Sequence, residues 1–123
     1  MQKKNERILV VDDEPDILET VQTVLEEEHY QVQTAVKFPD LSRDPASKPD
    51  LILLDIRLSG EDGITICQHL KRQEYTKDIP IILMSAHLPA QQVIAASGSN
   101  DFLAKPFDMD ELLTKVVTHL HAA

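Results

Sequence analysis

Three short runs of apolar residues divide the chain, and each of them ends at a polar residue. They cover residues 8–11, 51–54 and 79–84. Continuous apolar runs of this length, bounded by turn residues, are typical of strands that are buried on both faces of a parallel sheet. We therefore expect these three strands to be central and adjacent.

The remaining elements follow from the spacing of their apolar residues. Residues 30–36 alternate between apolar and polar positions, which predicts a half-exposed strand at a sheet edge. Helical spacing and capping residues predict a helix from Pro15, and further helices at about 64–72, 89–97 and 109–121, while 102–104 forms a last short strand. Three prolines between residues 37 and 50 allow only a short or broken helix there. The chain thus alternates five strands with about five helices.

This alternation indicates an α/β fold with a doubly wound parallel sheet, because right-handed crossovers return each strand in the same direction. A chain of 123 residues is long enough for one domain with its own core and short for two. We therefore expect residues 1–123 to form a single domain.

Charge and composition narrow the possible settings. The net charge of −9 argues against direct binding to nucleic acid or to an anionic membrane. The sequence contains neither an apolar stretch of membrane-spanning length nor the apolar part of a signal peptide, so we expect a cytoplasmic protein. The single cysteine, Cys67, cannot form an internal disulfide and is expected to fill the core.

Reactive side chains follow four of the predicted strands, whose carboxyl ends lie along one edge of a parallel sheet. They are Asp12 and Asp13, Asp55, Ser85, and Lys105. Crowded carboxylates repel one another, and a hard divalent cation such as Mg²⁺ relieves that repulsion. A carboxylate beside such an ion can attack phosphorus, with the amine and the hydroxyl assisting the phosphoryl oxygens. The joint placement predicts a phosphate acceptor site, although Asp12 and Asp13 taken alone could simply cap the first helix.

Four segments carrying these residues resemble the signature blocks of response-regulator receiver domains. The blocks are VVDDEP at 10–15, LILLDIRLSGEDG at 51–63, the Ser85-Ala86 pair, and FLAKPF at 102–107. The resemblance covers nearly the whole chain, and it implies a flavodoxin-like five-stranded sheet with strand order 2-1-3-4-5. It also implies that Asp55 is the phosphoacceptor and that Lys105-Pro106 is a cis peptide.

By the same resemblance, Mg²⁺ binds directly to Asp13 and Asp55, through water to Asp12, and to the backbone carbonyl of Arg57. Ser85 would follow the phosphate, and Lys105 would pair with it.

Two departures from the family pattern affect these expectations. Phe102 occupies the switch position where many relatives have tyrosine, so its ring can rotate inward but has no hydroxyl to donate. Ser59 replaces a proline that is usual there, which we expect to loosen the loop. Arg57 and His87 border the expected pocket and could tune the lifetime of the acyl phosphate.

The implied function is that of a two-component receiver. A sensor histidine kinase or a histidine phosphotransfer protein donates the phosphoryl group. The face formed by the helix at 89–97, the last strand and the helix at 109–121 then binds a downstream target or the output domain of a longer parent. Such a protein catalyses its own phosphorylation and slow dephosphorylation but no turnover of a separate substrate, and we expect a monomer or a weak dimer.

Two other classes stay open from the sequence. A metal-dependent phosphatase also forms an aspartyl phosphate, but it usually carries a second acid two residues after the nucleophile, where this chain has Arg57. A receiver that binds partners without being phosphorylated would need none of the acid, hydroxyl and amine set.

Overall fold

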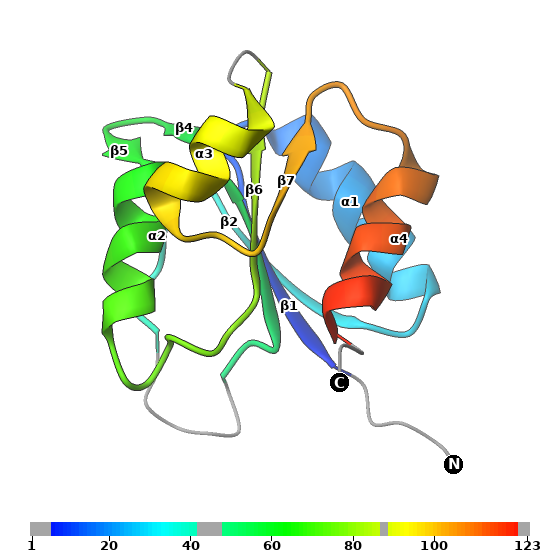
Figure 1. Ribbon diagram of the computed structural model, residues 1–123. Coiled ribbons are helices and arrows are strands. Elements are labelled where there is room, and N and C mark those ends of the chain that lie inside the picture. Colours follow the sequence, from blue (N-terminus) through cyan, green and yellow to red (C-terminus); the bar gives the residue numbers. More distant parts are fainter. Residues whose placement is uncertain (1–5, 42–47, 87–88, 121–123) are drawn as a thin grey trace.

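The computed structural model describes residues 6–41, 48–86 and 89–120 and shows one central parallel sheet (Figure 1). Its strand order is β2-β1-β3-β6-β7, which is the predicted order 2-1-3-4-5 when the sheet strands alone are counted. The strands are β1 (Arg7–Val11), β2 (Gln31–Ala35), β3 (Leu51–Asp55), β6 (Ile81–Ser85) and β7 (Asp101–Ala104). The three apolar runs lie in the three central strands, and the alternating strand β2 lies at an edge, as predicted.

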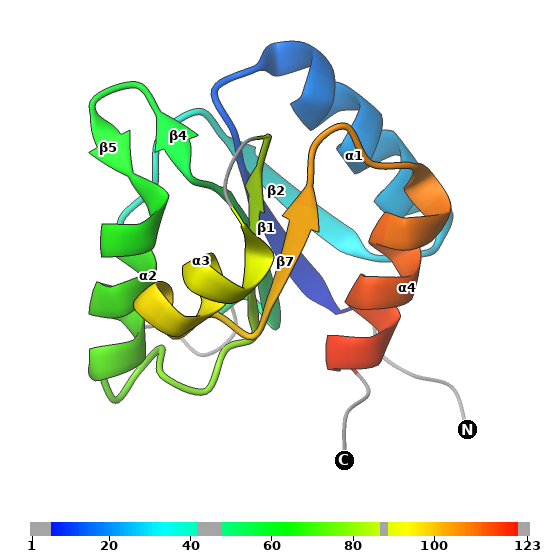
Figure 2. The same ribbon diagram turned by 45° about the horizontal axis from the view of Figure 1, so that its top comes forward.

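In the described ranges, four helices cover the two faces of the sheet. They are α1 (Pro15–Glu27), α2 (Gly63–Arg72), α3 (Ala90–Ser97) and α4 (Met109–Leu120). Helices α1 and α4 lie on one face, and α2 and α3 lie on the other (Figures 1 and 2). The described residues between β2 and β3, 36–41 and 48–50, contain no helix. Of the approximately five helices expected, four therefore lie in the described residues. The prolines of this segment, which allowed only a short or broken helix, disfavour helical backbone.

The core has two halves because successive residues of a strand point to opposite faces of the sheet. In β3, Ile52 and Leu54 pack with α2 and α3, while Leu51 and Leu53 pack with α1 and α4. All five residues of β3 and all five of β6 are buried. The central strands are therefore fixed in register, and the residues at their ends are held with them.

Local signals set the helix boundaries. The Asp62 carboxylate accepts a hydrogen bond from the Ile64 amide at 3.0 Å and begins α2. Gly98 has a φ of 77° and ends α3 as the predicted left-handed cap. The Asp108 carboxylate accepts from the Glu111 amide at 2.7 Å, as expected for the start of α4.

A small antiparallel hairpin, which the sequence reading did not predict, follows β3 directly. It pairs β4 (Arg57–Leu58) with β5 (Glu61–Asp62), and Gly60 turns the chain with a φ of 76°. Ser59 stands in the turn of this hairpin. None of the helices in the described ranges combines the length and the apolar character required to span a membrane.

Candidate functional site

The carboxyl ends of three neighbouring strands form the floor of the candidate site. Val11 is opposite Leu54 in the sheet, so Asp12 and Asp55, the residues that follow them, lie side by side. Asp55 is opposite Met84, which places Ser85 one residue further along the adjacent strand. Hydrogen bonding of the sheet therefore brings Asp12, Asp55 and Ser85 to one edge.

Three carboxylates gather at this edge. Asp12, Asp13 and Asp55 each offer an oxygen atom, and these atoms lie within 4.8 Å of one another. Asp12 is fully buried, Asp55 is 4% exposed and Asp13 is half-buried. The Asp55 carboxylate accepts a weak hydrogen bond from the Arg57 amide at 3.4 Å. Asp55 is thus almost enclosed but still reaches solvent.

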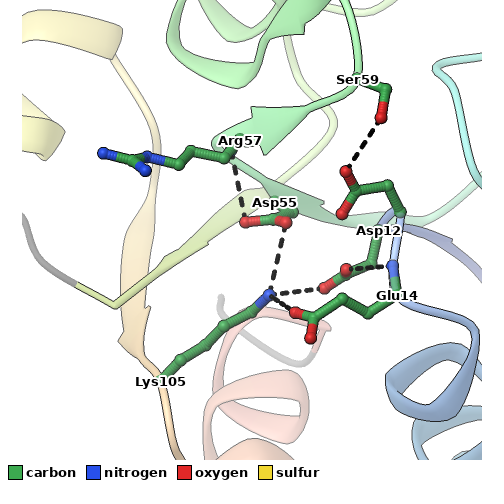
Figure 3. Close-up of polar contacts among 7 residues, drawn as sticks. Asp12, Glu14, Asp55, Arg57, Ser59 and Lys105 are labelled. Carbon is green, nitrogen blue, oxygen red and sulfur yellow. Dashed lines mark hydrogen bonds and ion pairs between the residues drawn. The ribbon is translucent and has the colours of Figure 1, made fainter.

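Lys105 supplies the positive charge of the cluster (Figure 3). Its ammonium lies 2.8 Å from Asp12 Oδ2, 3.3 Å from Asp55 Oδ2 and 3.3 Å from Glu14 Oε1. The predicted proximity of the amine to the Asp55 carboxylate is confirmed. The same residue precedes a cis peptide bond to Pro106, as the resemblance implied.

The electrostatic environment affects Asp55 and Lys105 in different ways. Burial raises the pKa of the Asp55 carboxyl group, and the nearby Asp12 carboxylate raises it further, while Lys105 opposes both. Burial by itself would lower the pKa of Lys105, but its hydrogen bond to Asp12 and the charges of Asp12 and Asp55 outweigh burial and raise it. The ammonium therefore stays charged, and a negative charge on Asp55 is costly.

The alternative role of Asp12 and Asp13 as helix caps receives little support. Asp12 Oδ1 accepts from the Glu14 amide at 2.9 Å, which orders the turn ahead of α1. Glu14 is the N-cap residue of α1, and its side chain makes no capping hydrogen bond. Asp13 instead accepts a hydrogen bond from the Ser59 hydroxyl at 3.2 Å.

The other predicted residues lie around this cluster. Ser85 is the buried last residue of β6, and its carbonyl accepts from the Lys105 amide at 2.9 Å. Phe102 is 6% exposed and packs in the core half that faces α2 and α3. The Arg57 side chain is exposed and extends away from the acids (Figure 3). His87 lies outside the described residues.

The sequence did not predict the contacts that three residues make at the site. Glu14 forms an ion pair with Lys105. Ser59 donates a hydrogen bond to Asp13, a contact that the expected loosening of its loop did not take into account. A Cβ atom at Gly63 would lie 2.5 Å from the Asp55 carbonyl oxygen and 2.7 Å from Ile56 Cα. A glycine at the first position of a helix, where its conformational freedom is not required, is the one signal that could have indicated this close approach.

The donor set fits a hard divalent cation. Three carboxylates offer oxygen ligands of the kind that Mg²⁺ and Ca²⁺ prefer, and one ammonium group leaves their charge incompletely balanced. Lys105 and the edge of the sheet together could also hold the oxygens of a phosphoryl group.

The family model described as the response regulator receiver domain matches residues 8–117. The DNA-binding dual master transcriptional regulator RpaA of Synechocystis sp. is 42% identical over 113 residues, which cover 89% of this chain and 47% of RpaA. The phosphate regulon transcriptional regulatory protein PhoB of Escherichia coli is 37% identical, again over 89% of this chain and 49% of PhoB. The chain therefore spans about half the length of these curated relatives.

Solved structures have the same fold. A putative response regulator from Chloroflexus aurantiacus is 33% identical with a TM-score of 0.79, and the match covers 95% of this chain and 98% of that one. The chemotaxis protein CheY4 of Vibrio cholerae is 25% identical with a TM-score of 0.82, over 93% and 98% of the two chains.

Proposed function

The chain belongs to the response-regulator receiver family, and from this premise we propose that Asp55 is the residue that accepts the phosphoryl group. The observation that carries the proposal is the position of Lys105, whose ammonium lies 3.3 Å from Asp55 and 2.8 Å from Asp12. A positive charge held at the end of β3 is where the oxygens of a phosphoryl group on Asp55 would need it.

The chemical step is a displacement at phosphorus. A carboxylate oxygen of Asp55 forms a bond to phosphorus while the P–N bond of a donor phosphohistidine breaks. The electron pair of that bond stays on the imidazole nitrogen, which takes up a proton from solvent. Lys105 then exchanges part of its contact with Asp12 and Glu14 for contact with the phosphoryl oxygens, and the Ser85 hydroxyl donates a hydrogen bond to them.

Asp12, Asp13 and Asp55 are the side chains that would hold Mg²⁺, with the Arg57 carbonyl as a further ligand. When bound, the ion would offset the charge of the carboxylates and of the phosphoryl oxygens. The fit of three carboxylate oxygens within 4.8 Å supports this assignment. The raised pKa of Asp55 supports it as well, because a site that penalises negative charge gains from an added cation.

The signal would leave the site through Ser85 and Phe102. When Ser85 moves toward the phosphate, the Phe102 ring repacks into the space that becomes free, and the surface formed by α3, β7 and α4 changes. Phe102 is already buried here, so the change would be a repacking within the core rather than entry of an exposed ring.

The partners follow from the family and from the charge of the chain. A sensor histidine kinase or a histidine phosphotransfer protein would donate the phosphoryl group. Because the chain spans about half of RpaA and PhoB, whose names describe transcriptional regulators, the recipient is an output domain of a longer parent or a separate protein target. The net charge of −9 supports a unit that does not itself contact nucleic acid or membrane. The proposal further places it in the cytoplasm as a monomer or weak dimer.

We propose that the protein turns over no separate substrate. A metal-dependent phosphatase usually carries an acid two residues after the nucleophile, where this chain has Arg57, and the exposed Arg57 side chain extends away from the acids (Figure 3). Release of phosphate from a small ester such as p-nitrophenyl phosphate at a multiple-turnover rate would revive that class.

The test is labelling by acetyl phosphate, which supplies the phosphoryl group without a kinase. Wild-type protein should incorporate phosphate with Mg²⁺ and fail to do so with EDTA. Asp55→Asn should remove incorporation, whereas Asp40→Asn, which changes an exposed acid away from the cluster, should leave it unchanged. Labelling of Asp55→Asn at the wild-type rate would refute the proposal.

A further inference from the structure

Ser59 joins the hairpin to the acidic cluster across a long separation in sequence. Its hydroxyl donates a hydrogen bond to Asp13 Oδ2 at 3.2 Å, and the two residues are 46 positions apart. We propose that Ser59 is a positioning residue, which holds the Asp13 carboxylate at the cluster and thereby strengthens the binding of a divalent cation. This inference rests on the proposed function, because it concerns the same acidic site.

Asp13 is the carboxylate of the cluster that Lys105 does not neutralise. The Lys105 ammonium makes its ion pairs with Asp12, Glu14 and Asp55. Within the described part of the chain, the hydrogen bond that the structure gives to Asp13 comes from the Ser59 hydroxyl. The position of Asp13 therefore depends on a single neutral donor.

Without that donor, repulsion would move Asp13 away from the cluster. The oxygens of Asp12, Asp13 and Asp55 lie within 4.8 Å of one another, and like charges at this distance repel. Asp13 is half-buried, so its side chain can rotate toward solvent, whereas Asp12 is fully enclosed. A carboxylate has two oxygens, and it can accept from Ser59 with one while the other remains available to a cation.

The hairpin that carries Ser59 is itself anchored. On the far side of the turn, Glu61 Oε1 accepts a hydrogen bond from the Phe38 amide at 3.0 Å, and Phe38 packs against the core. At the base, the Gly63 amide donates to the Ile56 carbonyl at 2.8 Å. Ser59 is therefore a donor fixed by the fold, able to hold a side chain in place.

The consequence is a weaker cation site when the hydroxyl is lost. Outer partners of ligating carboxylates contribute to metal affinity, and Ser59 is exposed, so we expect an effect at the lower end of their range. Ser59→Ala should raise the dissociation constant for Mg²⁺ by about tenfold. Ser59→Thr keeps a hydroxyl and should restore most of the affinity.

Isothermal titration calorimetry with Mg²⁺ on the full chain measures this directly. The matched control is Thr65→Ala, because the Thr65 hydroxyl also donates to an aspartate, Asp62, at 3.2 Å but lies outside the cluster. This control should bind Mg²⁺ as the wild type does. In acetyl phosphate labelling, Ser59→Ala should need about ten times more Mg²⁺ for half-maximal rate while the maximal rate is unchanged.

Two results would overturn the inference. One is Mg²⁺ affinity of Ser59→Ala equal to that of the wild type, and the other is equal weakening in Ser59→Ala and Ser59→Thr, which would indicate a backbone effect. In both cases Mg²⁺ binding by the wild-type protein would leave the proposed function intact. Absence of Mg²⁺ binding in the wild type would instead overturn the proposed function together with this inference.

Discussion

Replacing Asp55 by asparagine should stabilise the fold at neutral pH when no divalent cation is added. The nearby Asp12 charge, at 4.8 Å or less, costs at least about 3.5 kcal/mol at an effective dielectric constant of 20. The Lys105 ammonium at 3.3 Å returns about 5 kcal/mol under the same assumption. Burial of a charge costs several kcal/mol more, so we expect Asp55→Asn to raise the free energy of unfolding by about 2 kcal/mol.

The pH dependence has a defined sign. Burial and the Asp12 carboxylate raise the pKa of Asp55 above 3.8, so the folded state binds more protons than the unfolded state between 3.8 and the raised value. The wild type therefore loses stability as pH rises through this window. The asparagine variant has no such group, so its advantage should grow across the window and stay constant above it.

Urea unfolding followed by far-ultraviolet circular dichroism is the suitable assay, because the chain has no tryptophan. Samples should contain EDTA or Mg²⁺, and Asp40→Asn serves as the control for loss of an exposed acid. Mg²⁺ at 100 times its dissociation constant should stabilise the wild type by about 2.7 kcal/mol. The difference in free energy of unfolding between the wild type and Asp55→Asn should then become smaller. Destabilisation by Asp55→Asn at pH 7 in EDTA would refute the reasoning.

Three further substitutions test other parts of the structure. The pKa of Asp101 is lowered because hydrogen bonds from His119, the Phe102 amide and Lys115 outweigh the effect of burial. Asp101→Asn should therefore lower the free energy of unfolding by about 1–2 kcal/mol at pH 7. That cost should fade as pH falls through the lowered pKa, and urea titrations at several pH values would measure it. Gly63→Ala should lower the free energy of unfolding by about 1–3 kcal/mol and slow acetyl phosphate labelling, because the added Cβ would press on the backbone of residues 55 and 56. An unchanged free energy of unfolding would contradict this close contact. The Lys71 ammonium donates hydrogen bonds to the backbone carbonyls of Lys77 and Ile79 and to the side-chain carbonyl of Asn100. Lys71→Met should therefore lower the midpoint temperature of thermal unfolding. An unchanged midpoint would show that these hydrogen bonds do not stabilise the fold.

The position of the site could be predicted because it follows from strand ends. Asp12, Asp55 and Ser85 each end or follow an apolar run, and strands that alternate with helices must be parallel, so these residues had to meet at one edge. Lys105 joins them because it directly follows β7, which pairs with β6. These steps need only periodicity and handedness.

The contacts made by loops could not be predicted in the same way. Ser59 meets Asp13 only because a hairpin of two-residue strands turns back after β3, and such short strands have no apolar period that would reveal them. Glu61 anchors the hairpin to the Phe38 amide, a partner that no local pattern indicates. Side-chain contacts between loops depend on the folded backbone, and they are the part that only the structure supplied.

The central claim is that one carboxylate, that of Asp55, is the phosphoryl acceptor. The most direct measurement is to label the wild-type protein with acetyl phosphate and Mg²⁺, reduce the acyl phosphate with borohydride, and locate the reduced residue by tandem mass spectrometry. We predict reduction at Asp55 alone, and no reduction when EDTA replaces Mg²⁺. Reduction at Asp12 or Asp13, or labelling that persists in EDTA, would contradict it.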